Sequence, residues 1–252
     1  MAEILNMEHL PELPYAVEEA MNRLRVNLSF LGKDVRKIMV ISSLPNEGKS
    51  FVTTHLWRQM AMAGSKSVLV DADLRKSTMC EKYHLRKSHG EKLVGMTHYL
   101  SGDQELQDVI YETSIENGYL LPNSDNILNP SMLIEGKRFS ETLDTLAEQY
   151  RYVFIDCPPL GLVSDGERIA NLCDGAVLVV RGGLTSKKVI KNSVRQLERA
   201  GCPLLGVVMN RAGGSKKGYY GKRYGGYYGR YGGTYYYGKK GKKDNPYYTD
   251  TK

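Results

Sequence analysis

The stretch KIMVISSLPNEGKSF, residues 37–51, decides the fold of this chain. It opens with an apolar run typical of a buried strand and leads into a helical pattern over residues 51–63. Between the two, SSLPNEGKS matches the phosphate-loop pattern G-x-x-x-x-G-K-[ST], except that Ser43 stands at the first glycine. A chance match on a surface loop is the alternative reading. The strand before the loop and the helix after it favour a nucleotide site.

Similar apolar runs recur along the chain and predict further strands at residues 67–73, 118–122, 151–156, 175–180 and 204–210. Helical patterns at residues 51–63, 138–149 and 186–200 separate several of them. Strands that are apolar on both faces and joined by helical crossovers form a mainly parallel sheet. The sequence therefore predicts an α/β fold with a doubly wound, mostly parallel sheet, like that of P-loop NTPases with a deviant Walker A loop.

The positive charge of the chain is concentrated at its C-terminal end. The whole sequence carries +7, whereas residues 215–252 hold ten Lys/Arg and two Asp/Glu, a charge of +8. The other 214 residues hold 25 basic and 26 acidic side chains, a charge of −1. A nearly neutral body does not indicate a nucleic-acid-binding surface, so we do not expect nucleic acid as the partner of the body.

The remaining composition points to a cytoplasmic protein. The four cysteines form no C-x-x-C pair and are expected to be free thiols. We see no signal-peptide pattern and no apolar run of roughly 18 residues, the length that a spanning helix needs. Any association with the membrane is therefore expected to come through a partner.

We divide the chain into three parts. Residues 1–36 form an N-terminal segment with a helix beginning near Pro14, whose apolar stripe is expected to pack on the domain; its members are Val17, Met21, Leu24, Leu28 and Leu31. Residues 37–214 form the nucleotide-binding domain. Residues 215–252 hold 11 of the 18 tyrosines and nine glycines, a low-complexity composition that predicts a disordered tail.

The phosphate loop predicts how a nucleotide is held. Backbone N–H groups at the start of a helix carry positive partial charge and can surround phosphate oxygens. Lys49 is expected to reach the β- and γ-phosphates, and the Ser50 hydroxyl to ligate Mg²⁺. The nucleotide-binding residues are thus predicted to be Ser43, Pro45, Asn46, Glu47, Gly48, Lys49, Ser50 and Phe51.

Two acidic motifs strengthen this prediction. VLVDADLR places Asp71 and Asp73 at the carboxyl end of one strand, and VFIDCPP places Asp156 at the end of another. Ligands of open α/β sheets bind at this edge, where phosphoryl transfer needs carboxylates for the metal and the nucleophile. One such aspartate is often only a helix cap or a turn residue, but three beside a phosphate loop indicate a catalytic site. The neighbouring Cys157 is expected to be a small filler.

The set of a Ser-substituted phosphate loop, VLVDADLR, VFIDCPP and a terminal tyrosine cluster resembles the bacterial tyrosine kinases (BY-kinases) of capsule and exopolysaccharide synthesis. The resemblance is to their free-standing cytoplasmic form, which works with a separate membrane adaptor. It extends through segments in the same order as in that family: GMTHYLSG (95–102), NPSML (129–133), KRF (137–139), VSDGERIANLCDGAVLVVRGG (163–183) and GVVMNR (206–211).

The resemblance implies ATP and Mg²⁺ as cofactors and a role for each matched residue. Lys49 and Ser50 would bind phosphate and Mg²⁺, Asp73 and Asp156 would organise the metal, and Asp71 would be the base, with the division between Asp71 and Asp73 left open. Asn210 matches an adenine-contacting asparagine, although a strand-ending turn residue is an equal reading.

The resemblance also implies partners. In that family an N-terminal Glu-x-x-Arg-x-x-Arg pattern helps subunits form a ring; here the matching residues are Glu19, Asn22 and Arg25, so the middle arginine is missing. Asn46 stands where the family's loop usually has glycine, and asparagine tolerates left-handed backbone. The expected partners are other copies of the chain, a membrane adaptor of the polysaccharide co-polymerase type, and tyrosine-containing protein substrates. Recruitment to the inner face of the cell membrane would follow.

The tail is then predicted to be a substrate, phosphorylated by a neighbouring copy. The candidate acceptors are Tyr219, Tyr220, Tyr224, Tyr227, Tyr228, Tyr231, Tyr235, Tyr236, Tyr237, Tyr247 and Tyr248. Three alternatives stay open. The tail could bind single-stranded nucleic acid through its Tyr, Lys and Arg side chains, or serve no purpose. The body could be a switch ATPase of the partitioning type, although those carry a signature lysine at the position of Leu44.

Overall fold

The computed structural model describes residues 4–7, 10–87 and 91–212. The predicted disordered tail, with all eleven candidate acceptor tyrosines, lies outside the described residues. Everything below concerns the described part of the chain.

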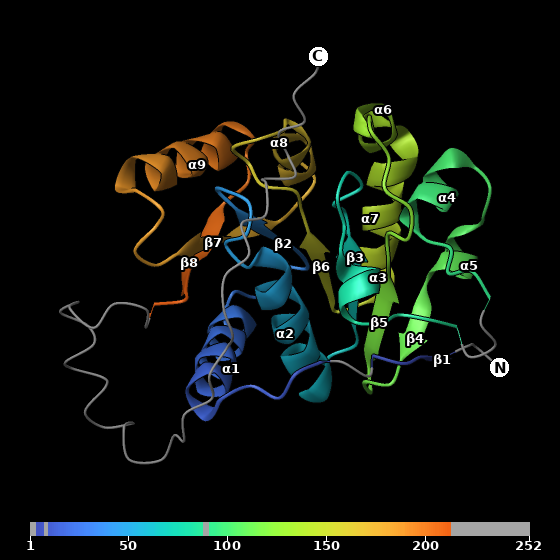
Figure 1. Cartoon of the computed structure of the whole chain (residues 1–252), viewed down its shortest axis with the longest axis horizontal. Coiled ribbons are helices and arrows are strands. Elements are labelled where there is room, and N and C mark those ends of the chain that lie inside the picture. Colours follow the sequence, from blue (N-terminus) through green and yellow to red (C-terminus); the bar gives the residue numbers. More distant parts are fainter. Residues whose placement is uncertain (1–3, 8–9, 88–90, 213–252) are drawn as a thin grey trace, which may run out of the picture. The chain divides into compact units, whose positions relative to one another are not determined.

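The protein is built on an eight-stranded sheet in the order β1-β4-β5-β3-β6-β2-β7-β8 (Figure 1). All neighbouring strands are parallel except β4 and β5. The strands span Ile4–Leu5 (β1), Lys37–Ser42 (β2), Ser67–Asp71 (β3), Tyr111–Thr113 (β4), Gly118–Leu121 (β5), Tyr152–Asp156 (β6), Gly175–Arg181 (β7) and Leu204–Asn210 (β8). The predicted mainly parallel α/β fold is thus confirmed.

All six predicted strands are present, with ends that shift by at most two residues. The sequence patterns missed β1 and β4, at the edge next to β5. A strand of two or three residues is too short to show an alternating pattern, so neither could be recognised from sequence.

Helices cover both faces of the sheet. One face carries α1 (Tyr15–Ser29), α2 (Lys49–Met62) and α3 (Met79–Lys82). The other carries α4 (Met96–Ser101), α5 (Leu106–Val109), α6 (Ser131–Glu135), α7 (Lys137–Gln149), α8 (Asp165–Ala170) and α9 (Lys187–Arg199). Strand β2 shows why two cores form: Met39 and Ile41 face one core, whereas Ile38 and Val40 face the other.

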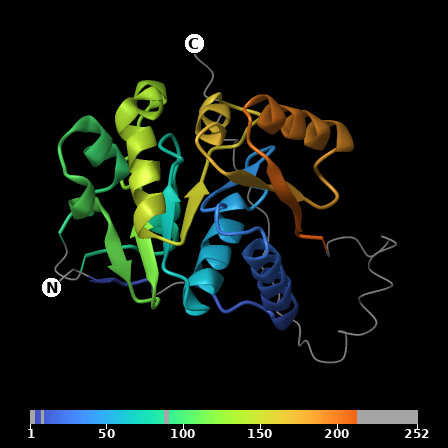
Figure 2. The same ribbon diagram turned by 180° about the vertical axis from the view of Figure 1, so that it is seen from behind.

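Helix α1 lies beside α2 in both views (Figure 1, Figure 2). As predicted, its apolar stripe packs on the domain: Met21 and Leu28 are buried, and Leu24 packs against the same core. The expectation was wrong at one end. Leu31 follows the last helical residue, Ser29, and its side chain is 38% exposed, because the chain has left the helix before the stripe is complete.

The central strands bring the predicted site residues to one edge. In the parallel pair β3 and β6, Asp71 is in register with Asp156. Strand β2, on the other side of β6, ends at Ser42 and runs directly into the phosphate loop and α2. Chain segments that are distant in sequence therefore meet at the carboxyl edge of the sheet, where open α/β folds bind ligands.

Candidate functional site

The phosphate loop is shaped by two residues with left-handed backbone. Asn46 has a φ of 62° and Gly48 a φ of 97°, and α2 begins directly after Gly48. A side chain at Gly48 would also collide with Asn210, because an added Cβ would lie 2.0 Å from its Nδ2 atom. Glycine is therefore required at this position by both conformation and space.

Glu47 anchors the loop from within. Its side chain is fully buried, and one carboxylate oxygen accepts the Leu44 N–H at 2.7 Å. The other oxygen accepts the Arg181 N–H at 3.2 Å and the Thr185 hydroxyl. The side chain thus ties the loop to the end of β7 and the turn that follows, so any contact of Glu47 with phosphate would use its backbone N–H.

Two other predicted loop residues also turn their side chains into the protein. The buried Ser43 hydroxyl accepts a hydrogen bond from Ser193 of α9 at 2.8 Å. The Phe51 ring packs against the core beneath α2, 4.4 Å from the ring of His55. Pro45 is partly buried at the tip of the loop. For Ser43 and Phe51 too, any contact with a nucleotide would use the backbone.

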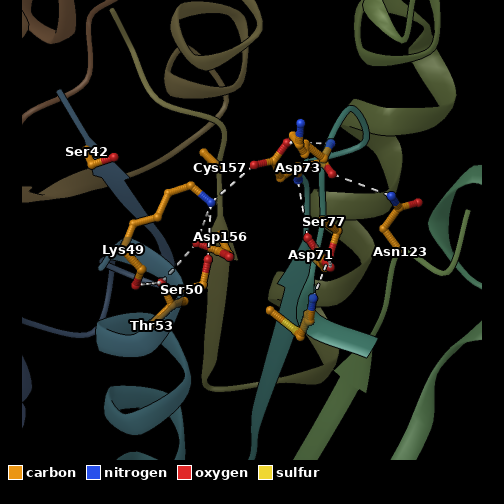
Figure 3. Close-up of polar contacts among 12 residues, drawn as sticks. Ser42, Lys49, Ser50, Thr53, Asp71, Asp73, Ser77, Asn123, Asp156 and Cys157 are labelled. Atoms are coloured by element: carbon orange, nitrogen blue, oxygen red, sulfur yellow. Dashed lines mark hydrogen bonds and ion pairs between the residues drawn. The ribbon is translucent and has the colours of Figure 1, made fainter. Parts of the chain in front are cut away.

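Lys49 links two of the three predicted aspartates, Asp73 and Asp156, to the loop. Its ammonium lies 3.2 Å from Asp73 Oδ2, 3.5 Å from Asp156 Oδ1 and 3.2 Å from the Ser50 hydroxyl (Figure 3). The Lys49 side chain is 12% exposed, so these charges interact in a setting that water screens weakly. The predicted convergence of Lys49, Ser50, Asp73 and Asp156 is what the structure shows.

Asp156 is buried and receives support from α2. The Thr53 hydroxyl lies 3.3 Å from Asp156 Oδ1. Burial raises the pKa of Asp156, while the Lys49 charge and hydrogen bonds from Ser50 and Thr53 oppose that rise. Thr53 was not predicted, although it stands one helical turn after Lys49, a spacing that could have revealed it.

Asp71 is fully buried and lacks a direct ion pair with Lys49 among the described contacts. Its Oδ1 accepts the Asp73 N–H at 3.3 Å, and its Oδ2 accepts the Ser77 hydroxyl. Burial, with the neighbouring Asp156 and Asp73 carboxylates, raises the pKa of Asp71 to about 8 against the opposing effects of Ser77 and Lys49. A carboxyl group tuned in this way is suited to proton transfer near neutral pH.

The residues fit a magnesium nucleotide better than a metal bound by protein alone. Within the described ranges, no three His, Cys, Asp or Glu side chains form a group that could hold a metal ion. Mg²⁺ typically takes one or two carboxylates and keeps waters and phosphate oxygens as its other ligands. The Ser50 hydroxyl and the carboxylates of Asp73 and Asp156, gathered around Lys49, supply such a partial set.

Comparisons with known proteins identify the family. A family model described as "AAA domain" matches residues 35–171. Tyrosine-protein kinase CpsD of Streptococcus agalactiae is 35% identical over 211 residues, which cover 82% of this chain and 90% of that protein. The crystal structure of the chimerical protein CapA2B2 aligns with a TM-score of 0.72 and 32% identity over 81% of this chain and 88% of that one. The chain belongs to the bacterial tyrosine kinase family.

A more distant likeness marks the wider fold group. The septum site-determining protein MinD of Pyrococcus horikoshii, solved in complex with Mg-ADP, aligns with a TM-score of 0.59 and 26% identity. The alignment covers 72% of each chain. The chain thus shares its P-loop core with this septum site-determining protein, which was solved with Mg-ADP.

In this tyrosine kinase, Arg75 is a further site residue that the sequence pattern did not single out. It follows Asp73 by two residues, and its guanidinium contacts the buried Asp165 of α8 at 2.5 and 3.1 Å. Arg75 also donates to the Leu128 carbonyl at 2.9 Å and to Ser131. The turn that carries Asp73 is therefore clamped to segments far along the chain. No local pattern in the sequence indicates that pairing.

The structure also shows the contacts of Asn210, the predicted adenine-contacting residue, and of the predicted oligomer-interface residues on α1. The amide of Asn210 donates to the Glu47 carbonyl at 2.9 Å and accepts the Arg211 N–H, so it braces the phosphate loop. On α1, Asn22 accepts two hydrogen bonds from Arg25, at 3.1 and 2.9 Å, and Glu19 lies one turn earlier.

In the described part of the chain, no helix has the length and apolar character that crossing a bilayer requires.

Proposed function

We propose that this kinase transfers the γ-phosphoryl group of ATP to tyrosine hydroxyls, chiefly those in the C-terminal tail of a neighbouring copy. The observation that carries the proposal is the convergence of Lys49, Asp73 and Asp156 beside the buried Asp71, at the end of the phosphate loop (Figure 3). Family membership gives the reaction class, and the geometry supports the roles that we propose for the residues.

Lys49 and the loop would hold the nucleotide. The backbone N–H groups at the start of α2 would surround phosphate oxygens, and the Lys49 ammonium would neutralise the β- and γ-phosphates. Ser50, Asp73 and Asp156 would hold Mg²⁺, which would supply positive charge against the negative charge that develops on the transferred phosphoryl group. Asn210 would position the loop and contact the adenine.

Asp71 would take the proton. As the tyrosine oxygen bonds to the γ-phosphorus, the bond from phosphorus to the β–γ bridging oxygen breaks and ADP leaves. The hydroxyl proton of the tyrosine passes to the Asp71 carboxylate. Its raised pKa, about 8, makes this carboxylate a stronger base than an exposed aspartate.

The acceptors are proposed to be the eleven tyrosines of residues 215–252. A glycine-rich chain of 38 residues spans about 31–37 Å root-mean-square, enough to enter a neighbouring subunit's site. Each phosphate adds about −1.5 to −2 charges, so roughly four to six would cancel the +8 of the tail. Self-association through α1, around Glu19, Asn22 and Arg25, would supply the neighbour.

The cellular setting is proposed from the family. The kinase would act in the cytoplasm, at the inner face of the cell membrane, recruited by a membrane adaptor of the polysaccharide co-polymerase type. There it would regulate the synthesis and export of capsular or exopolysaccharide, with other tyrosine-containing proteins as further substrates.

The rival function is a switch ATPase like MinD. Two observations favour the kinase: the tyrosine-protein kinase CpsD is 35% identical to this chain against 26% for MinD, and Leu44 stands where the signature lysine of those ATPases is expected. The tyrosine-rich tail supplies an acceptor that a switch ATPase does not need.

The test uses two chains. A truncation after Gly214 keeps the catalytic body, and full-length Lys49→Met supplies a tail without phosphoryl-transfer activity. We expect tail phosphotyrosine, mapped by mass spectrometry with ATP and Mg²⁺, when the two are mixed. Lys49→Met alone should lose about 10²–10³-fold or more in rate, the cost of removing one transition-state contact.

Lys33→Met, at an exposed lysine outside the site, is the matched control and should retain full activity. The same tail peptides should be examined in protein isolated from the native host, where any activating partner is present. ATP hydrolysis without phosphotyrosine in both settings would contradict the proposal and favour the switch ATPase. Salt-sensitive binding of single-stranded oligonucleotides by the tail, again without phosphotyrosine, would favour the nucleic-acid alternative.

A further inference from the structure

The orientation of Asp71 depends on a short polar chain that begins at Ser77. Among the contacts of the described residues, neither oxygen of the Asp71 carboxylate meets a cation; one accepts the Asp73 N–H and the other the Ser77 hydroxyl. Both donors belong to the turn that follows β3 (Figure 3). The direction of a fully buried carboxylate is thus set by seven consecutive residues of its own chain, 71–77.

The geometry fixes the direction of the Ser77 hydrogen bond. The Ser77 oxygen accepts the Met79 N–H at 3.1 Å, and a backbone N–H can only donate. The single hydroxyl proton of Ser77 is therefore free to point at Asp71. Ser77 acts as a donor to the carboxylate oxygen, which leaves the remaining lone pairs of Asp71 to receive a proton.

Ser77 is in turn held by Asn126, which comes from the loop after β5. The Ser77 N–H donates to Asn126 Oδ1 at 2.9 Å, and Asn126 Nδ2 donates to the Ser77 carbonyl at 3.0 Å. One side-chain amide therefore pairs with both backbone groups of one residue. If the side-chain oxygen and nitrogen of Asn126 changed places, both hydrogen bonds to Ser77 would be lost. The hydrogen-bond network therefore determines which of the two atoms is the oxygen.

A second asparagine extends the chain back to the site. The buried Asn123 donates to Asn126 Oδ1 at 3.1 Å and reaches the Asp73 carbonyl at 3.5 Å. The loop is attached to the turn at a further point, since the Ile127 N–H donates to the Leu74 carbonyl at 2.9 Å. The turn that carries both aspartates is thus fastened to residues about 50 positions later in the sequence.

We propose that Ser77 is the positioning residue for Asp71 in phosphoryl transfer, and that Asn126 positions Ser77. The inference rests on the proposed function, in which Asp71 accepts the hydroxyl proton of the acceptor tyrosine. Without the Ser77 hydroxyl, the buried Asp71 Oδ2 loses its donor and the carboxylate is free to turn away from the tyrosine oxygen. Ser77 touches neither nucleotide nor acceptor in this account, so it affects turnover and not binding.

The test compares Ser77→Ala with Ser77→Thr, which keeps a hydroxyl, and with Thr78→Ala. Thr78 is the exposed neighbour of Ser77 and offers only its backbone carbonyl to the described contacts. With the Lys49→Met chain as acceptor, we expect Ser77→Ala to lower kcat about 10- to 100-fold with the KM for ATP unchanged. Ser77→Thr should recover most of the rate, and Thr78→Ala should match the wild type. Asn126→Ala should lower kcat in the same direction by a smaller factor.

A double variant separates positioning from general loosening of the turn. If Ser77 works through Asp71, Ser77→Ala should cost little further rate in an Asp71→Asn background, because the group it positions is already disabled. Full additivity of the two losses would overturn the inference, as would a Ser77→Ala enzyme with wild-type kcat. A wild-type chain that forms no phosphotyrosine would overturn the proposed function as well. The two failures are therefore distinct.

Discussion

The ends of β3 and β6 look alike in sequence and differ in chemistry. VLVD and VFID each close a buried strand with an aspartate, and the sheet sets Asp71 directly against Asp156. Both side chains are nearly inaccessible, with 0% and 2% exposure. Yet Asp156 meets Lys49 and Thr53 from α2, whereas Asp71 meets only the turn that follows its own strand.

This difference shows that the neighbouring structural element, and not the sequence motif of the strand, distinguishes the pKa shifts of the two carboxyl groups. Burial raises the pKa of both groups, but for Asp156 the Lys49 charge is the strongest opposing influence. For Asp71 the neighbouring Asp156 adds to the rise, and its pKa reaches about 8. One strand end therefore places its carboxylate beside a cation that opposes the rise in pKa, and the other leaves its carboxylate with a raised pKa suited to exchanging a proton.

The largest expected effect comes from neutralising each strand end in turn. Asp71→Asn should lower kcat about 10²–10⁴-fold, the usual contribution of a general base, with ATP affinity and Mg²⁺ requirement little changed. Asp156→Asn should also slow turnover, but it should raise the Mg²⁺ concentration needed for half-maximal rate, because a proposed metal ligand is lost. Steady-state kinetics with separate ATP and Mg²⁺ titrations distinguish the two.

Asp144→Asn, at a well-exposed carboxylate paired with Lys37, controls for the loss of a negative charge and should leave both titrations unchanged. Equal shifts in the Mg²⁺ requirement for Asp71→Asn and Asp156→Asn would show that both aspartates contribute to metal binding in the same way. Asp71 and Asp156 would then not differ in their contribution to metal binding.

The sequence predicted the strand ends well because their signals are local. A continuous apolar run such as residues 151–156 identifies a buried strand, and the residue that ends it must lie at the sheet edge. Lys49, Asp73 and Asp156 could therefore be expected to meet before the structure was seen. The short helices α3 to α6 were not expected, since helices of four to six residues show less than two turns of periodicity.

The partners of these residues could not be predicted because they depend on long-range packing. Asn126 reaches Ser77 across 49 positions, and Asp165 reaches Arg75 across 90. Nothing in a periodic pattern says which polar side chain of a loop turns toward which backbone group. The direction of Glu47 is a similar case: the phosphate-loop motif places it near phosphate, and packing directs its carboxylate to Arg181 and Thr185.

A smaller effect should follow from releasing the turn after β3 from α8. Arg75→Ala would leave the buried Asp165 carboxylate without its cation, which costs about 3–5 kcal/mol when a pair is fully buried. Since the Arg75 side chain is 23% exposed, we expect about 2–4 kcal/mol in the free energy of unfolding. Urea unfolding measures it, with Arg195→Ala on the exposed side of α9 as the control.

Arg75→Lys should recover only part of that stability, because an ammonium cannot make the two-point contact of a guanidinium. An Arg75→Ala protein as stable as the wild type would show that the turn needs no clamp. The turn after β3 would then keep its position without the contact to α8.

The smallest expected effect is an acid sensitivity carried by α2, the helix that serves Asp156. His55 of α2 is fully buried, and neither of its ring nitrogens has a hydrogen-bond partner in the described structure. Burial, with the nearby Arg58 and Lys82 charges, lowers the pKa of His55 from 6.5 to about 4. The folded chain therefore keeps this ring neutral in a pH range where the unfolded chain protonates it.

The sign of the pH dependence follows from that difference in pKa. Between pH 6.5 and about 4 the unfolded state binds a proton that the folded state does not, so the free energy of unfolding falls as the pH is lowered. His55→Leu removes this proton uptake. The free energy of unfolding of this variant should therefore depend less on pH than that of the wild type between pH 6.5 and about 4. Above pH 7 the two proteins should show the same slope. Urea unfolding at several pH values measures the slope, and His84→Asn, which removes a histidine at an exposed position, provides the control. Equal slopes for His55→Leu and the wild type would show that α2 accommodates a charged ring, which would remove one of the contrasts between the β6 end and the β3 end.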